Sequence, residues 1–171
     1  MLKIAFNQNY IHPLDENHRF PMIKYELIPE QLLRENTCSS DNFFKPGIIS
    51  DEIVLKTHEK EYFDRFKNLK LSKKEIREIG FPLSKELVER EMVIAQGTIE
   101  CVHYSIRHGI SMNIAGGTHH AFYDRGEAFC MLNDQAIAAK YLINKKLAKK
   151  IMIIDLDVHQ GNGTASIFST N

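Results

Sequence analysis

The spacing of apolar positions predicts one long helix in the middle of the chain. Between residues 84 and 108, apolar side chains recur three or four positions apart, as on a helix with one buried face. Ser84 can cap the start of this helix, and Gly109 can end it. The residues that form the apolar stripe are Leu87, Val88, Met92, Ala95, Ile99, Val102 and Ile106.

Shorter stretches with the same spacing predict further helices. Ser72 and Glu75 fit a capping box for a brief helix that ends near Gly80. Pro29 should divide the helical segment 19–36 into two pieces, because proline does not fit a helix interior. The other predicted helices span residues 52–57, 58–68 and 132–144, the first capped by Asp51 and the last by Asn133 or Asp134.

Three short apolar runs predict strands. Residues 2–6 and 110–115 form the first two, with polar loops at 7–17 and 37–47. Residues 151–154 are apolar without alternation, which is typical of a strand buried on both faces. The order strand, helix, strand from 110 to 154 predicts parallel strands joined by a right-handed crossover. Loops that follow the two strands should then meet at one edge of the sheet.

Polar groups gather where the third predicted strand ends. Asp155, Asp157 and His159 occupy every second position, so in an extended chain they share one side. Two carboxylates and an imidazole at the end of a buried strand are unfavourable unless a cation binds there. This pattern predicts a metal site at the carboxyl edge of the sheet, where open α/β folds place ligands. Residues 161–164 then predict a turn and a helix start.

Two adjacent histidines, His119 and His120, follow Gly116 and Gly117 after the second predicted strand. The parallel topology should bring them to the edge that carries Asp157, although about forty positions separate them in the chain. Beside a metal ion, one imidazole can act as a general base and the other as an acid or electrostatic partner.

Composition is that of an ordinary globular domain. Of the 171 residues, 43% are hydrophobic and 26% charged, and 22 basic residues balance 22 acidic ones. This balance gives no reason to expect nucleic acid, and no apolar run approaches the roughly 18 residues of a membrane helix. Cys38, Cys101 and Cys130 are widely spaced, and the N-terminus lacks a signal-peptide pattern. We expect a cytoplasmic protein with reduced thiols, no membrane or nucleic-acid partner, and one domain. The oligomeric state stays open.

Two long motifs resemble the zinc-dependent histone deacetylase family. They are GGTHHAFYDRGEAFCMLND at residues 116–134 and IMIIDLDVHQGNGT at 151–164. HRFPM at 18–22 and IGFPLSKELVERE at 79–91 are most similar to its class IV and bacterial deacetylase-like branch. The resemblance implies the three-layer arginase–deacetylase α/β fold with a parallel sheet. It also implies hydrolysis of acetyl or other acyl groups from lysine or a related acylated amine.

The resemblance assigns roles to the polar residues. His119 and His120 match the paired catalytic histidines. Asp155 matches the carboxylate that supports the first histidine and joins a potassium (K⁺) site, and Asn162 matches the support of the second.

Asp157 and His159 match two of the family's three zinc (Zn²⁺) ligands, and Phe129 matches an aromatic wall of the acyl-lysine tunnel. Ala128 stands where the family usually has glycine. If the backbone there requires a positive φ, alanine costs on the order of 1 kcal/mol.

The third zinc ligand, an aspartate, and the tyrosine that acts in the transition state have no match up to Asn171. The sequence therefore predicts that residues 1–171 are the N-terminal portion of a single deacetylase domain whose C-terminal part is missing. We expect the fold to be incomplete, the sheet to have an exposed edge, and the chain to be inactive alone.

Two alternatives remain. An arginase-like binuclear manganese hydrolase shares the implied fold, but has an aspartate where this chain has Gly161. A non-catalytic binding or scaffold protein could also retain this half-site.

Overall fold

Three short parallel strands form the sheet of this computed structural model, which describes residues 1–169. The strands are β1 (Lys3–Ala5), β2 (Phe43–Phe44) and β3 (Ser111–Asn113), in the order β2-β1-β3. Ile4 of β1 pairs with Phe43 on one side and with Met112 on the other. Ile4 and Ala5 are buried, which explains why the apolar run at the N-terminus forms the central strand. The α/β class and the parallel sheet are confirmed.

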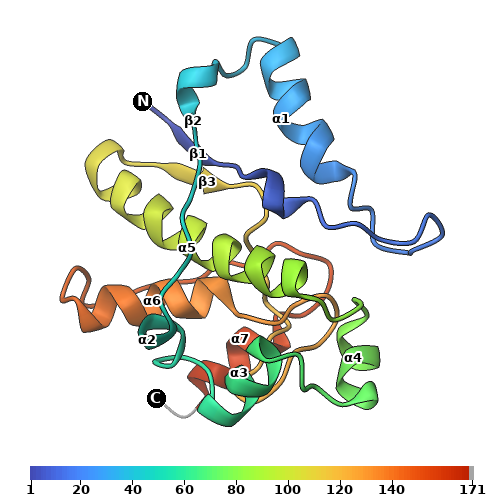
Figure 1. Cartoon of the computed structure of the whole chain (residues 1–171). Helices are drawn as coiled ribbons and strands as arrows, with labels where there is room; N and C mark the ends of the chain where they lie inside the picture. The colour runs from blue at the N-terminus through green and yellow to red at the C-terminus, as the bar shows by residue number, and fades with distance from the viewer. Residues whose placement is uncertain (170–171) are drawn as a thin grey trace.

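Helix α5 (Lys85–His108) crosses the molecule beneath the sheet and contacts both β3 and α6 (Asp134–Asn144) (Figure 1). In that view α1 stands at the top beside the strands, and the shorter helices lie at the bottom near α6. The remaining helices are α1 (Lys24–Arg34), α2 (Asp51–Val54), α3 (Lys60–Lys67), α4 (Lys73–Ile79) and α7 (Asn162–Phe168), with 3-10 turns η1 (Gln8–Tyr10) and η2 (Ser40–Asn42).

The predicted caps of α5 and α4 are confirmed. Ser84 Oγ accepts a hydrogen bond from the backbone N–H of Leu87 at 3.1 Å, and Gly109 ends α5 with φ 86°. In α4, Ser72 and Glu75 form the capping box, and Gly80 follows in the left-handed conformation. Side-chain capping and glycine at the helix end therefore act as expected.

Two other predictions about helices need correction. Pro29 does not divide 19–36 into two helices, because α1 continues through it. Pro29 and Tyr25 lie four positions apart and are both buried, so packing of this face offsets the hydrogen bond that proline lacks. The helix predicted at 52–57 begins one residue earlier, after Ser50, and ends at Val54.

The loop predicted at 37–47 contains a strand that the pattern did not indicate. Phe43 and Phe44 pair with β1, and Phe44 packs against Tyr104 of α5 with ring centroids 4.6 Å apart. A strand of two residues is too short to show alternation.

The third predicted strand is wrong. Residues 151–154 form no strand, and no segment within residues 1–169 pairs with them. They are also not buried on both faces: Met152 is 78% exposed and Ile154 66%, and beyond them Leu156 is 92% and Val158 91% exposed. A strand needs a partner for its backbone groups and cover for its apolar faces. The described residues supply neither, so the strand–helix–strand unit is not completed.

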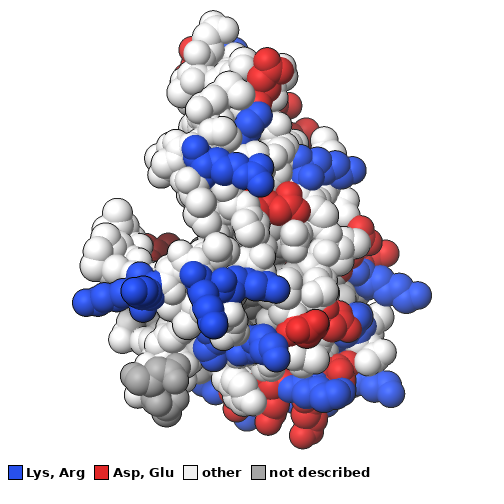
Figure 2. All heavy atoms as spheres, turned by 90° about the vertical axis from the view of Figure 1, so that its left-hand side faces the viewer, with Lys and Arg blue, Asp and Glu red and all other residues white. Residues whose placement is uncertain are grey.

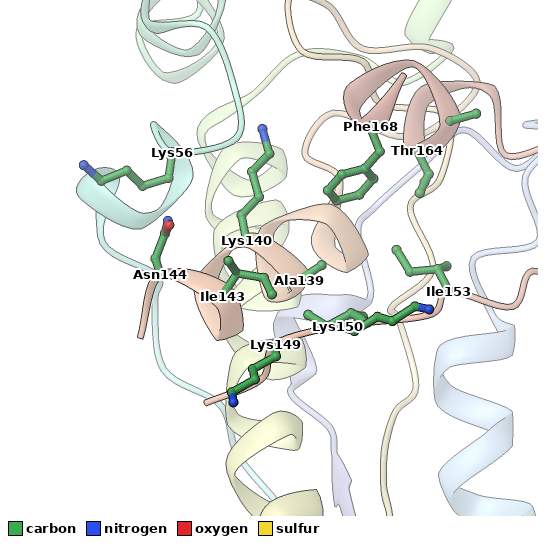
Figure 3. Close-up of a pocket in the computed structure, with 12 residues that line it drawn as sticks. Lys56, Ala139, Lys140, Ile143, Asn144, Lys149, Lys150, Ile153, Thr164 and Phe168 are labelled. Atoms are coloured by element: carbon green, nitrogen blue, oxygen red, sulfur yellow. The ribbon is translucent and has the colours of Figure 1, made fainter. Parts of the chain in front are cut away.

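Beside this segment the surface is hollowed. A cavity of about 1000 Å³ opens between α6, α7 and residues 149–153, and its lining includes Ile143, Ile153 and Phe168 (Figure 3). On the face seen in Figure 2, Lys and Arg side chains gather across the middle of the molecule. Lys145, Lys146, Lys149 and Lys150 follow the C-terminus of α6, where cations favour the helix dipole.

No helix among residues 1–169 is both long and apolar enough to span a membrane.

Candidate active site

Asp134 holds the loop that carries the histidine pair. This loop leaves β3 through Gly116 and Gly117, and Gly117 has φ +95°. The buried carboxylate of Asp134 accepts hydrogen bonds from the backbone N–H groups of Gly117 and Thr118, at 3.0 and 2.8 Å. The hydroxyls of Thr118 and Thr98 donate to the same carboxylate at 2.7 and 2.6 Å. The sequence indicated only a helix cap for Asp134, and its spacing from Thr118 carries no signal of this role.

A second network of buried hydrogen bonds, centred on Asn133, also supports this loop. Asn133 caps α6 by accepting from the N–H of Ala136, and its side-chain amide donates to Ala121 O and Thr164 Oγ1, each at 3.0 Å. The backbone N–H of Asn133 donates to His58 Nε2 at 2.9 Å. Burial lowers the pKa of His58 to about 4, so this ring is neutral and can accept.

Helix α7 contacts the same loop by backbone atoms. The N–H of Thr164 donates to His119 O at 3.0 Å. A Cβ on Gly163 would lie 2.4 Å from Ala121 O and 2.7 Å from His119 O. Only glycine permits this approach, which sets the position of Asn162 relative to the histidines.

The two histidines have different partners. His119 Nδ1 lies 2.6 Å from Asp155 Oδ2, and His120 Nδ1 lies 2.7 Å from Asn162 Oδ1. The hydrogen bond to His119 lowers the pKa of Asp155, so its carboxylate is ionised at neutral pH. Each ring therefore donates from Nδ1 and keeps Nε2 for other chemistry. The two ring centroids lie 4.1 Å apart.

The structure brings the two predicted metal ligands to these histidines. His119 Nε2 lies 3.9 Å from Asp157 Oδ1, and the ring of His159 lies 6.0 Å from that of His120. The proximity predicted from parallel topology is thus present, although the strand that was to create it is absent. Both ligands are accessible: the side chain of Asp157 is 50% exposed and that of His159 is 73% exposed.

Asp157 and His159 fit a zinc ion in chemistry and spacing, but not in number. Asp157 Oδ1 and His159 Nδ1 lie 3.1 Å apart, close to the roughly 3.3 Å edge of a tetrahedron with zinc bonds of about 2.0–2.1 Å. The backbone N–H of His159 also donates to Asp157 Oδ1, and this bond is the main reason why the pKa of Asp157 is lowered. Within residues 1–169, however, no group of three His, Cys, Asp or Glu side chains could hold a metal ion. Catalytic zinc usually has three protein ligands.

Gly161 leaves no room for another carboxylate at its position. A Cβ there would lie 2.5 Å from Asp155 Oδ2 and 3.4 Å from His119 Nδ1. An aspartate at 161, as in the binuclear alternative, would displace the pair formed by Asp155 and His119.

Phe129 belongs to an aromatic cluster beside the loop. Its ring centroid lies 4.9 Å from that of Phe20, 5.0 Å from Phe81 and 6.0 Å from His18. The N–H groups of Ala128 and Phe129 donate to Glu78 O and Ile79 O at the end of α4, at 3.0 and 2.7 Å.

The backbone at these two residues is strained, because Ala128 has φ 43° and Phe129 has φ 67°. Positive φ is unfavourable for side chains with a Cβ. The backbone at residue 128 thus has the positive φ at which alanine is expected to be less stable than the family's usual glycine.

Comparison with known proteins identifies the family from the sequence. The histone deacetylase domain matches residues 15–171. An uncharacterised protein of Picosynechococcus sp. is 39% identical over 165 residues, which are 96% of this chain and 55% of that protein. The acetoin utilization protein AcuC of Staphylococcus aureus is 29% identical over 160 residues, covering 87% of this chain and 41% of AcuC.

Solved structures share the fold. The histone deacetylase homologue of Aquifex aeolicus superposes with a TM-score of 0.80 at 23% identity, over 98% of this chain and 47% of that one. The HDA15 HD domain superposes with a TM-score of 0.81 at 19% identity, over 99% and 52%. The chain spans about half the length of the relatives it matches. It has the histone deacetylase fold, and by its sequence it belongs to the histone deacetylase family.

Proposed function

We propose that this chain supplies the histidine pair and two metal ligands of a zinc-dependent hydrolase that removes acetyl groups from acylated lysine or a related amine. One observation carries the proposal: two imidazoles in contact, each fixed at Nδ1 by a different partner, stand beside an Asp–His pair with the spacing of zinc ligands. The family membership supports a deacetylase-type reaction. A homologue of similar fold was solved in complex with SAHA, which makes SAHA a suitable binding probe.

The different partners suggest a division of labour. Asp155 carries a negative charge that can balance an imidazolium at His119, whereas the amide oxygen of Asn162 is neutral. We assign His120 Nε2 as the base that takes the proton of the attacking water. For the second step His119 must carry a proton on Nε2 as well as on Nδ1, as the imidazolium that Asp155 balances. It gives the Nε2 proton to the leaving amine, and the proton taken up by His120 afterwards replaces it.

Zinc held by Asp157 and His159 would act as a Lewis acid toward the acyl carbonyl and would make a water molecule more acidic. Two donors are too few for a catalytic zinc site. We therefore propose that a third ligand comes from polypeptide outside residues 1–169, and that the same polypeptide covers residues 151–158. Asp155 further suits a potassium ion, whose other ligands the described residues do not define.

A zinc titration tests the site without relying on turnover. Calorimetry on the chain co-expressed with the C-terminal half of the Picosynechococcus relative should show one zinc ion bound, and Asp157→Asn and His159→Gln should each remove that binding. Asp124→Asn, on an exposed aspartate that pairs with Arg125, is the matched control and should bind as the wild type does. Binding that survives both ligand variants would contradict the assignment.

An activity assay tests the division of the site between polypeptides. We expect no hydrolysis of an acetyl-lysine reporter by the chain alone. Co-expression with the C-terminal half of the Picosynechococcus relative should give turnover that His120→Ala abolishes. Turnover by the isolated chain would show that no third ligand is needed. Zinc binding without turnover in the reconstituted protein would favour the non-catalytic scaffold.

A further inference from the structure

Two cationic side chains lie against the aromatic cluster around Phe129, which the family resemblance assigns to the wall of the acyl-lysine tunnel. The guanidinium of Arg19 lies over the ring of Phe129, with Cζ 4.9 Å from the centroid. Lys24 Nζ lies over the rings of Phe20 and Tyr25, at 4.6 and 5.1 Å. Phe20 and Phe129 are themselves in contact, so each ring of this pair has one cation over it.

Neither cation has an ion-pair partner among residues 1–169. Six other lysines and arginines among these residues have an ion-pair partner, for example Arg65 with Glu75 at 2.5 Å and Lys67 with Asp51 at 2.5 Å. Arg19 and Lys24 differ from the other unpaired basic residues in that they lie over the two rings of that aromatic pair. Cation–π contact attracts Arg19 and Lys24 to the rings, but leaves their positive charge uncompensated.

The charge of Asp157 also acts on Lys24. Lys24 is half-buried, and burial is the first cause of its lowered pKa, followed by the repulsion of Arg90. The carboxylate of Asp157 acts in the opposite direction. A zinc ion on Asp157 would neutralise that carboxylate and leave Lys24 without a nearby negative charge.

We propose that Lys24 and Arg19 select acylated amines that carry a carboxylate close to the acyl group. This inference rests on the proposed function. A carboxylate that enters along the Phe20–Phe129 pair would be the first counter-ion of both cations, whereas a substrate with neighbouring lysines would be repelled. The carboxylate can belong to the acyl chain, as in succinyl-lysine, or to an acidic residue next to an acetyl-lysine.

Binding of four fluorescent peptides, measured by polarisation, tests the proposal. The protein is the chain co-expressed with the C-terminal half of the Picosynechococcus relative and loaded with zinc. The reference contains acetyl-lysine flanked by alanine. The second has glutamate flanks, the third has lysine flanks, and the fourth carries succinyl-lysine between alanines. We expect one or both carboxylate peptides to bind about fivefold or more tightly than the reference, and the lysine-flanked peptide to bind more weakly. The second and fourth peptides show which source supplies the carboxylate.

Lys24→Met and Arg19→Met replace the aliphatic part of each side chain and remove its charge. In each variant, the affinity for the carboxylate peptides should fall toward that for the reference peptide. The affinity for the reference peptide itself should not change. Lys145→Met, on an exposed lysine after α6, should keep the preference. Thermal unfolding of each variant shows whether it is folded. Arg19 is exposed, so Arg19→Met should fold and can test the proposal even if Lys24→Met does not fold.

Equal affinity for all four peptides, or a preference that survives in both variants, would overturn this inference and leave the proposed function standing. Failure of the reference peptide to bind would instead count against the proposed function, and the inference would fall with it.

Discussion

Asp134 Oδ1 accepts hydrogen bonds from both the backbone N–H and the hydroxyl of Thr118, at 2.8 and 2.7 Å. Asp134 is the first residue of α6, so these hydrogen bonds join the helix to the loop that precedes His119. The position of the histidine pair therefore depends on a buried residue that does not itself touch the candidate reaction centre.

Asp134→Asn should destabilise the protein by about 2–3 kcal/mol, because an amide cannot accept all of these hydrogen bonds and its NH₂ group faces donors. Urea denaturation measures the loss. Asp124→Asn, on the surface, should change the free energy of unfolding by less than about 0.5 kcal/mol. Equal stability of the two variants would show that the Asp134 contacts carry little energy.

Ala128→Gly should stabilise the protein by about 0.5–1 kcal/mol. Glycine adopts φ 43° without strain, and this gain exceeds the larger entropy that glycine gives the unfolded chain. Ala165→Gly, on an exposed face of α7, should instead destabilise the protein by about 1 kcal/mol. Thermal unfolding distinguishes them, and a destabilised Ala128→Gly would mean that the backbone there is not strained.

Stability should fall as the pH drops from about 6.5 toward 4. The folded pKa of His58, about 4, lies below the usual value of 6.5, so in this range the unfolded chain binds the extra proton. The loss attributable to His58 should reach about 2 kcal/mol at pH 5.

In His58→Gln, the side-chain oxygen can still accept from Asn133, and no group titrates at that position. Its free energy of unfolding should vary less between pH 7 and pH 5 than that of the wild type. Identical pH dependence in the two proteins would exclude His58 as the cause.

Self-association should increase with concentration through residues 151–158. Unpaired, apolar, extended segments add strands from other chains, and Met152 and Ile154 are 78% and 66% exposed. The double substitution Met152→Lys and Ile154→Lys should lower the sedimentation coefficient at high concentration. Ile106→Lys, on the exposed side of α5, should not. A wild-type chain that stays monomeric at all concentrations would contradict this.

Local signals made α5 predictable, since Ser84, Gly109 and the apolar stripe all indicate the same boundaries. The family resemblance predicted the contact between His119 and Asp155, and the topology predicted only that the two loops meet. The loops do meet, although residues 151–154 form no strand.

Other features depend on contacts that sequence spacing does not encode. Burial of Tyr25 and Pro29 keeps α1 in one piece, and two residues suffice for β2 only because β1 is already in place. The carboxylate of Asp134 has the same sequence signature as an ordinary helix cap. Residues 151–154 have the composition of a buried strand, but composition cannot supply the neighbour that such a strand needs.

The candidate metal ligands lie in an exposed segment of the chain, while the histidines beside them rest on a buried network. Under the proposed function, the polypeptide that covers residues 151–158 would also complete the metal site, so amide cleavage would require assembly of the two parts.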